Sequence, residues 1–303
     1  ADVTDAAFRR IITKYAKPDV LWTEFVAVDG LLSPGREVLL RDFMYTEGER
    51  PIVAQIFGGK PDNFYKVAGL IADLGFDGID INMGCPDKNV EKQGGGASLI
   101  KDPKRAQEII LATKEGGRGL PVSVKTRVGY NKVELDTWLP LLLETKPSAL
   151  TVHARTRKEM SLVPARWEHV AEAVELRNVI APETLIIGNG DVKDLVDARK
   201  KAEETGADGV MLGRAIFGNP FLFQGRTLES VSIKERLDIM LEHTKLFVEL
   251  LGDVKNFAIM KKHYKAYVNG FDGAKELRIA LMETNNVAEV EHIVSNWISH
   301  HSN

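Results

Sequence analysis

The chain has 303 residues, of which 44% are hydrophobic and 27% charged, with a formal net charge of −3 at pH 7. This composition is typical of a globular protein and excludes a fibrous or intrinsically disordered chain. No apolar run approaches the roughly 18 residues needed to span a bilayer, and the single cysteine excludes an intrachain disulfide. We therefore expect a cytoplasmic protein, in which any contact with nucleic acid requires a local basic face.

Short runs rich in β-branched residues recur along the chain and predict strands. They alternate with longer stretches of helical periodicity, which is the pattern of parallel βαβ units. In one such stretch Phe64, Val67 and Ile71 recur at three- and four-residue spacing and form an apolar stripe. The predicted strands are 20–25, 51–57, 78–83, 121–126, 149–153, 184–188 and 209–212.

A closed (β/α)8 barrel needs one strand more than these runs provide. The chain starts at Ala1, and residues 4–15 already have the pattern of a helix. We therefore predict a (β/α)8 barrel of the TIM type whose first strand lies upstream of residue 1.

The pattern becomes entirely helical near the C-terminus. Ser232 and Glu235 have the spacing of a capping box and mark the start of this region. The sequence thus predicts a barrel domain over residues 1–228 and a small all-helical domain over residues 229–303. The predicted helices of the second domain are 233–250, 256–269, 274–283 and 287–298.

Polar and ionisable residues follow the ends of six predicted strands. In a (β/α)8 barrel the working residues lie at the carboxyl ends of the strands and in the loops beyond them. A structural protein has little reason to place so many desolvated polar groups together, so this rim is the predicted active site. Its members are Gln55, Asn82, Cys85, Lys125, Arg127, His153, Arg155, the 188–191 loop, Gly213 and Arg214.

Two glycine-bearing loops follow the last two strands. Residues 188–191 are Gly-Asn-Gly-Asp, and Gly213 with Arg214 precedes a predicted short helix. Backbone N–H groups and a guanidinium can converge there on an anion, and barrels often bind phosphate after strands seven and eight. The alternative is that the glycines only shape tight turns. The presence of both loops, in this order, favours a phosphate-bearing ligand.

Lys125 ends a predicted strand and points toward the mouth of the barrel. Three interpretations stay open for it. The lysine is a cation beside the electron-rich edge of a flavin, a Schiff-base lysine of the aldolase type, or the partner of a neighbouring carboxylate. The strand-end position favours the functional interpretations over an ordinary ion pair.

Cys85 precedes Pro86 on a constrained turn that leaves a strand. A lone cysteine is more often a small buried hydrophobic residue. Here the strand-end position and the three glycines at 94–96 favour a functional thiol. A thiol with an unperturbed pKa of ~8.5 is mostly protonated at neutral pH, which suits a general acid better than a nucleophile. We therefore interpret Cys85 as a proton donor.

His153 also ends a strand. For a single histidine, a hydrogen-bonded structural role is the plainer alternative to contact with a bound group. No group of His, Cys, Asp or Glu residues in the sequence has the spacing of metal ligands, so we expect no catalytic metal.

Basic and aromatic residues are interleaved in the predicted C-terminal helices. Lysines such as Lys261 and Lys262 lie close in sequence to Tyr264 and Tyr267. Such a surface can follow an RNA backbone. An ordinary solvated helix face over a bundle core is an equal alternative.

With these motifs in order along the chain, the sequence closely resembles the tRNA-dihydrouridine synthases. The resemblance covers nearly the whole chain. It rests on the segments Ala1–Arg9, Ala54–Gly58, Ile81–Pro86, Gly94–Leu99, Val124–Gly129, His153–Arg157, Gly188–Asp191 and Gly213–Pro220, and in the tail on Lys262-His263, Gly270–Ala274 and Leu277-Arg278.

This resemblance implies an FMN enzyme that takes electrons from NADPH and acts on tRNA. Cys85 is then the catalytic acid. Asn82, Arg127 and Arg155 lie near the target uracil. The residues implied to hold FMN are Ala1, Gln55, Lys125, His153, Asn189, Gly190, Asp191, Gly213 and Arg214. The residues implied to contact RNA in the helical domain are Lys261, Lys262, His263 and Arg278.

The resemblance also implies a mechanism. A uridine flipped out of the tRNA stacks on the flavin, because only an extruded base can bring its ring atoms against the cofactor. Hydride passes from flavin N5 to uracil C6, and the Cys85 thiol protonates C5 from the opposite face, which gives 5,6-dihydrouridine. We expect a monomer.

Two other functions stay open from the residues themselves. One is an FMN barrel oxidoreductase that acts on a free small molecule, like dihydroorotate dehydrogenase, although such an enzyme has no need of a basic helical tail. The other is a phosphate-binding barrel of the aldolase type that uses Lys125. That function leaves Cys85 without a role.

Overall fold

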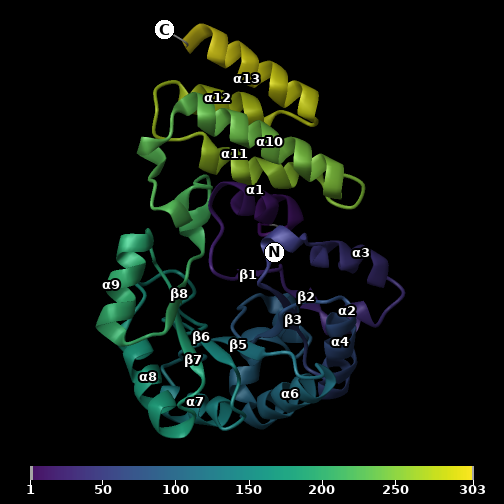
Figure 1. The fold of residues 1–303 in the computed structure, drawn as a ribbon, viewed down its shortest axis with the longest axis vertical. Helices are drawn as coiled ribbons and strands as arrows, with labels where there is room; N and C mark the ends of the chain where they lie inside the picture. Colours follow the sequence, from purple (N-terminus) through teal and green to yellow (C-terminus); the bar gives the residue numbers. More distant parts are fainter. Residues whose placement is uncertain (1–2, 302–303) are drawn as a thin grey trace. The chain divides into compact units, whose positions relative to one another are not determined.

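The computed structural model describes residues 3–301, which form two compact units (Figure 1). The α/β unit comprises Val20–Phe43 and Arg50–Arg214. The helical unit comprises Met44–Glu49, Ala215–Asn303 and the N-terminal segment up to Asp19, as far as these are described. Among residues 3–301, every helix is too short or too polar to cross a membrane.

The core of the α/β unit is a parallel sheet in which consecutive strands are neighbours (Figure 1). All of its pairings are parallel, as the alternation of strand and helix patterns predicts. The predicted positions of these strands are confirmed to within a residue or two. The strands are β3 (Ile52–Phe57), β4 (Gly78–Asn82), β5 (Val122–Arg127), β6 (Ala149–His153), β7 (Leu185–Asn189) and β8 (Gly209–Met211).

The first predicted strand, 20–25, is interrupted in the structure. It forms β1 (Leu21–Trp22) and β2 (Val26–Ala27), which both pair with β3. Between them the hydroxyl of Thr23 accepts a hydrogen bond from the backbone N–H of Gln55 at 3.0 Å. A side chain thus takes the place of a ladder carbonyl, and the regular strand is broken at that point.

The strands of the sheet occupy seven positions, because β1 and β2 share one edge of β3. Within residues 3–301, no strand joins β8 to β1 to close the ladder. The strand predicted upstream of residue 1 lies outside the described residues and stays a prediction. The curled parallel sheet with helices around it confirms the predicted TIM-type fold class.

Helices follow the strands of the α/β unit and cover the outside of the sheet (Figure 1). One of these helices begins after Asp102, whose carboxylate accepts from the N–H of Arg105 at 3.2 Å and caps the helix. Two short helices after β2 are too brief to give a periodic pattern, and the sequence did not predict them. The helices are α2 (Val28–Leu31), α3 (Arg36–Leu40), α4 (Pro61–Asp73), α5 (Lys88–Lys92), α6 (Pro103–Gly116), α7 (Leu135–Leu143), α8 (Glu168–Ile180) and α9 (Leu195–Thr205).

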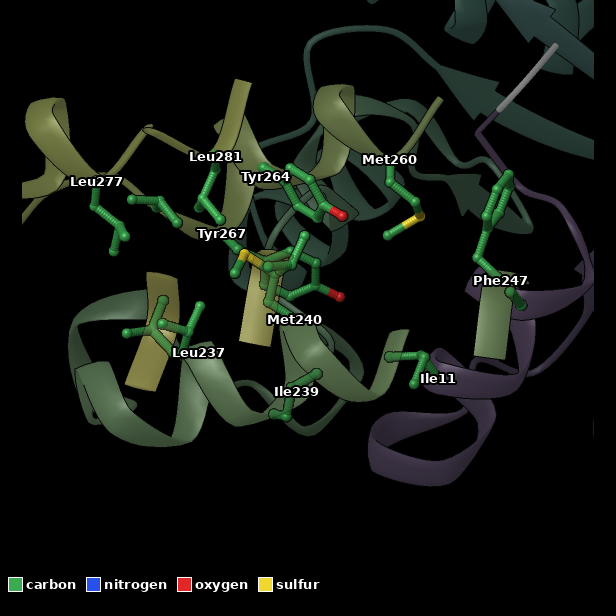
Figure 2. Close-up of a cluster of buried hydrophobic side chains, with 14 of the residues drawn as sticks. Ile11, Leu237, Ile239, Met240, Phe247, Met260, Tyr264, Tyr267, Leu277 and Leu281 are labelled. Atoms are coloured by element: carbon green, nitrogen blue, oxygen red, sulfur yellow. The ribbon is translucent and has the colours of Figure 1, made fainter. Parts of the chain in front are cut away.

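The helical unit contains the predicted C-terminal helices. The predicted start of this region is confirmed, because the N–H of Glu235 donates to the hydroxyl of Ser232 at 3.2 Å and Ser232 caps the first helix. Apolar side chains from several of these helices form one core (Figure 2). The helices are α1 (Ala6–Ala16), α10 (Ile233–Leu251), α11 (Met260–Tyr267), α12 (Ala274–Met282) and α13 (Val287–His301).

The predicted division after residue 228 differs from the observed units, because α1 packs with the C-terminal helices. Figure 2 shows Ile11 of α1 among the core side chains of the helical unit. The hydroxyl of Tyr15 donates to Glu242 on α10 at 2.7 Å. Gly218 lies against α11, since a Cβ there would be 2.2 Å from the carbonyl oxygen of Ala266. The boundary of the helical unit therefore falls earlier than predicted, and the unit includes the N-terminal helix.

Candidate active site

The predicted rim residues lie together at the carboxyl ends of the strands of the α/β unit. The register places Asn82 of β4 opposite Lys125 of β5. It also places Arg127 opposite His153, and His153 opposite Asn189 of β7. One edge of the sheet thus brings these polar side chains side by side, as the barrel geometry predicts.

A chain of buried and half-buried hydrogen bonds crosses β3, β4 and β5. The amide nitrogen of Gln55 donates to Oδ2 of Asp80 at 2.7 Å, and the hydroxyl of Ser123 donates to Oδ1 at 2.6 Å. The amide nitrogen of Asn82 donates to Oε1 of Gln55 at 3.1 Å. Asp80 and Ser123 were not predicted as site residues. The available signal was an acidic residue within the apolar run 78–83.

The loop that carries Cys85 is fixed by this chain of amides. Oδ1 of Asn82 accepts from the backbone N–H of Cys85 at 2.9 Å and from that of Gly84 at 3.2 Å. The carbonyl of Cys85 accepts from the N–H of Ala97 at 2.9 Å. A Cβ at Gly96 would lie 2.6 Å from that carbonyl oxygen, so only glycine permits this approach.

The thiol of Cys85 is half-buried. Desolvation by burial is the largest influence on it and raises its pKa above the ordinary value. The group is therefore a thiol at neutral pH. This state agrees with the predicted role of a proton donor and not with that of a nucleophile.

Arg127 and Arg155 are both buried and hold backbone carbonyls. Nε of Arg127 donates to the carbonyl of Gly84 at 2.8 Å, next to Cys85. Nε of Arg155 donates to the carbonyl of Val163 at 2.6 Å. Burial lowers the pKa of Arg127 to about 10, so the guanidinium stays charged at neutral pH. The structure shows both arginines fixing loops of the rim, and their contact with uracil stays a prediction.

Asp191 lies at the centre of a charged cluster in the predicted phosphate site. Its carboxylate forms an ion pair with the 3%-exposed Arg155 and another with Arg214 at 2.7 Å. The hydrogen bond from Arg155 holds the pKa of Asp191 below its ordinary value. Two guanidinium groups against one carboxylate leave a net positive charge. Arg214 is 73% exposed, so its remaining donors face solvent.

Gly190 occupies a backbone position that requires glycine. Its φ is +127°. A Cβ there would lie 2.8 Å from the Cβ of Ala165 and 3.1 Å from the ring of His153. At Gly213, by contrast, a Cβ would meet nothing within 4 Å, so the backbone borders open space beside Arg214.

Burial determines the protonation of Lys125 and His153. It lowers the pKa of Lys125 to about 8, and Arg127 adds to the effect. It lowers the pKa of His153 to about 2, with Lys125 as the next cause, so the ring is neutral. The guanidinium of Arg155 lies 3.3 Å from Nε2 of His153 and can only donate, so Nε2 is the acceptor and Nδ1 carries the proton. Nζ of Lys125 donates to Oδ1 of Asn189 at 3.3 Å.

The structure does not support the interpretation of Lys125 as the ion-pair partner of a neighbouring carboxylate. In the described part of the chain, Lys125 forms no ion pair with an Asp or Glu. Asp80 acts on it electrostatically and raises its pKa against the effect of burial. The lysine is therefore a buried cation that faces the rim.

The dihydrouridine synthase family matches residues 1–301 of the sequence. This chain belongs to the dihydrouridine synthase family. It is 44% identical to the probable tRNA-dihydrouridine synthase of Staphylococcus aureus strain COL, over 98% of this chain and 90% of the relative. It is 43% identical to the probable tRNA-dihydrouridine synthase 2 of Bacillus subtilis strain 168, over 98% of this chain and 91% of the relative.

Solved structures of other proteins share the fold. Morphinone reductase in complex with tetrahydroNAD matches with a TM-score of 0.51 at 13% identity, over 74% of this chain and 82% of that chain. The old yellow enzyme homologue from Zymomonas mobilis matches with a TM-score of 0.50 at 12% identity, over 74% and 83%. At these identities the likeness concerns the TIM-type fold.

Membership of the dihydrouridine synthase family makes this protein a flavin-dependent oxidoreductase. The rim residues fit a flavin nucleotide. The net positive cluster around Asp191 and the open space at Gly213 suit a phosphate. The buried cation of Lys125 suits the electron-rich edge of the ring system.

The remaining predicted site residues are differently placed. Ala1 lies outside the described residues. His263 is 0% exposed and packs against Phe8 and His243, with ring centroids 5.3 and 4.6 Å apart. The structure therefore removes His263 from the predicted RNA-binding surface, because its ring belongs to the core of the helical unit. Arg278 is half-buried and donates to the carbonyl of Val268 at 2.7 Å.

The predicted lysines of the helical unit reach the surface. Lys262 is exposed and Lys261 is half-buried, both on α11. Their contact with RNA stays a prediction. Among residues 3–301, no three His, Cys, Asp or Glu side chains are grouped as metal ligands. The predicted absence of a catalytic metal stays a prediction as well.

Proposed function

We propose that this protein reduces uridine in tRNA to 5,6-dihydrouridine, with FMN as its bound cofactor, NADPH as the reductant and Cys85 as the proton donor. The family supports the reaction class, since its close relatives are named tRNA-dihydrouridine synthases. The observation that carries the proposal is the position of Cys85. Its half-buried, protonated thiol lies on a loop that hydrogen bonds attach to the end of β4.

The residues that would hold FMN are distributed around the rim. Arg214 and the backbone at Gly190 and Gly213 would bind the phosphate, because the guanidinium supplies positive charge beside backbone N–H groups and the backbone at Gly213 borders open space. Lys125 and the amide of Asn189, which are hydrogen bonded to each other, would contact the ring system. His153 and Gln55 would complete the contact. When bound, the flavin supplies the hydride that reduces uracil at C6.

The protein's own contribution is orientation and one proton. Burial keeps the Cys85 thiol protonated, so it can give its proton to C5 of the uracil ring. Asn82 and Arg127 both hold the backbone just before the thiol, at its neighbour Gly84. A donor that is already fixed in place lowers the entropic part of the barrier to proton transfer.

The helical unit would bind the tRNA. Lys261 and Lys262 on α11 would contact phosphates. Arg278 would hold the C-terminal end of α11 in place through its hydrogen bond to the carbonyl of Val268. We place the reaction in the cytoplasm, because a protein with one cysteine gains nothing from an oxidising compartment. We also propose that the protein acts as a monomer.

Incubation of the purified protein with an unmodified tRNA transcript and NADPH tests this function. The expected product is tRNA with a mass gain of two hydrogen atoms at one or more uridines, found by mass spectrometry of its nucleosides. Flavin released by heat should chromatograph as FMN and not as FAD. Turnover of dihydroorotate without any reduction of tRNA would instead favour a small-molecule oxidoreductase and contradict the proposal.

A further inference from the structure

A buried carboxylate lies beneath the rim and has none of the roles assigned to the rim residues. Asp80 is in the middle of β4 and is 0% exposed. Its two oxygens accept from different strands, one from Ser123 on β5 and one from Gln55 on β3. A buried carboxylate costs free energy of desolvation, so it is seldom kept at a position where an apolar residue would serve.

The hydrogen bonds that start at Asp80 have a direction. Burial raises the pKa of Asp80, while its hydrogen bonds from Ser123 and Gln55 and the charge of Lys125 oppose that rise. In the structure both oxygens of Asp80 accept, so the side of the Gln55 amide that faces Asp80 is the NH2 group. The oxygen of Gln55 then faces Asn82 and accepts from its NH2 group. The oxygen of Asn82 is in turn left to accept from the N–H groups of Gly84 and Cys85.

Rotation of either side-chain amide by 180° breaks this series of hydrogen bonds. If Gln55 turned over, its oxygen would face the carboxylate of Asp80, and its NH2 group would face the NH2 group of Asn82. If Asn82 turned over as well, its NH2 group would face the N–H of Cys85, and the turn would lose both of its side-chain hydrogen bonds. The orientation of the two amides, and with it the position of the thiol, therefore depends on Asp80.

We propose that Asp80 is a positioning residue for Cys85, which it fixes through the oriented amides of Gln55 and Asn82. The value of this arrangement for catalysis rests on the proposed role of Cys85 as proton donor. The arrangement itself can be tested without turnover. Cys85 is the single cysteine of the chain, so its reaction with a thiol reagent reports on this turn alone.

The experiment is the rate of alkylation of Cys85 by iodoacetamide in the full-length protein, followed by intact mass across a range of pH. Asp80→Ala removes the acceptor that orients Gln55, so the turn loosens and the half-buried thiol becomes more exposed. Because burial raises the pKa of this thiol, exposure also increases its thiolate fraction. Both effects act in the same direction. The expected rise is on the order of fivefold, the factor that loss of one hydrogen bond gives.

Two matched variants separate the orientation of the Gln55 amide from a general loosening of the packing around Asp80. Asp80→Asn keeps an oxygen for Gln55, and its NH2 group can donate to the hydroxyl of Ser123, so alkylation should stay at the wild-type rate. Ser123→Ala removes the other hydrogen bond to Asp80 and leaves Gln55 oriented, so it should also behave like the wild type. A rise in Ser123→Ala equal to that in Asp80→Ala would indicate a general loosening and overturn the proposal.

The thermal midpoint of each variant is measured alongside. If Asp80→Ala fails to fold, Gln55→Met takes its place, because it cuts the link between Asp80 and Asn82 with a side chain of similar length. Wild-type alkylation in a folded Asp80→Ala or Gln55→Met protein would overturn the positioning role. That result would leave the proposed function intact, since reduction of tRNA by the wild type is a separate measurement.

Discussion

The two ends of the candidate active-site rim are held in different ways. After β3 and β4, one buried carboxylate and two neutral amides fix the backbone around Cys85. After β6, β7 and β8, the loops are joined by ion pairs of Arg155 and Arg214 with Asp191, and the outermost guanidinium is exposed. An amide has its donor and acceptor at opposite sides, so a chain of amides fixes direction. An ion pair fixes direction less but supplies charge.

This difference matches the two tasks that we propose for the site. Delivery of a proton to one carbon of a ring depends on the position of the donor atom. Retention of an anionic group depends on net charge and on open N–H groups. A change at one end of the rim should therefore leave the property of the other end intact, and substitutions at each end can test that separation.

Replacement of Cys85 should have the largest effect. In Cys85→Ala, formation of dihydrouridine in tRNA should fall by at least about a hundredfold, the typical loss for a general acid. Serine should not rescue the activity, because a hydroxyl is a much weaker acid than a thiol. The content of bound flavin should equal that of the wild type. Near-normal turnover in Cys85→Ser would indicate that Cys85 is a packing residue and not the proton donor.

Replacement of Arg214 should act on the other property. In Arg214→Ala, the Kd for FMN should rise by about ten- to a hundredfold, as expected for loss of a charge-assisted hydrogen bond. The alkylation rate of Cys85 should not change. Arg105→Ala, which removes a half-exposed arginine on α6, is the control and should retain flavin. Unchanged flavin affinity in Arg214→Ala would contradict the phosphate assignment.

His153 predicts a dependence of stability on pH. Its pKa is lowered to about 2 by burial, against an ordinary value of 6.5. Between these two pH values the unfolded chain binds a proton on His153 and the folded chain does not. The free energy of unfolding therefore decreases as the pH falls below 6.5. At pH 5 the loss is about 2 kcal/mol relative to pH 8. Urea unfolding of His153→Gln at both pH values should lack this component, and an equal pH dependence in the two proteins would contradict it.

The lysines of α11 should give the smallest effect. The double replacement of Lys261 and Lys262 by Glu should weaken tRNA binding. It should also reduce the salt dependence of binding by a slope of ~0.9 for each lysine that pairs with a phosphate. Reduction of the flavin by NADPH should not change. The control replaces Lys234 and Lys245 by Glu, two lysines on α10 that already pair with carboxylates. Equal tRNA affinity in the test and control variants would indicate that α11 presents an ordinary solvated face and does not bind tRNA.

Much of the fold followed from local patterns in the sequence. The strands from β3 to β8 were predicted because each is a short apolar run between helical stripes. The break in 20–25 was not predicted, because it depends on where the hydroxyl of Thr23 meets β3. The partner of α1 was not predicted either. An apolar stripe indicates that a helix face is buried, and it does not indicate which helices cover it.

The sequence predicted the site residues that follow strand ends. It did not predict the residues inside the strands that support them. Gln55, Asn82 and Lys125 were found by position. Asp80 was missed because it lies within a strand, where its hydrogen-bond partners are known only once both neighbouring strands are placed beside it. His263 was placed on a surface by its basic neighbours, although its own ring packs inward.

Separate measurement of the two half-reactions is the sharpest test of Cys85 as the proton donor. Stopped-flow absorbance can follow reduction of the bound flavin by NADPH, and then its reoxidation by tRNA, in wild type and in Cys85→Ala. We expect the first rate to be unchanged and the second to fall by at least about a hundredfold, because the thiol acts only when uracil accepts its proton. Equal rates of reoxidation by tRNA in the two proteins would contradict the assignment of Cys85 as the proton donor.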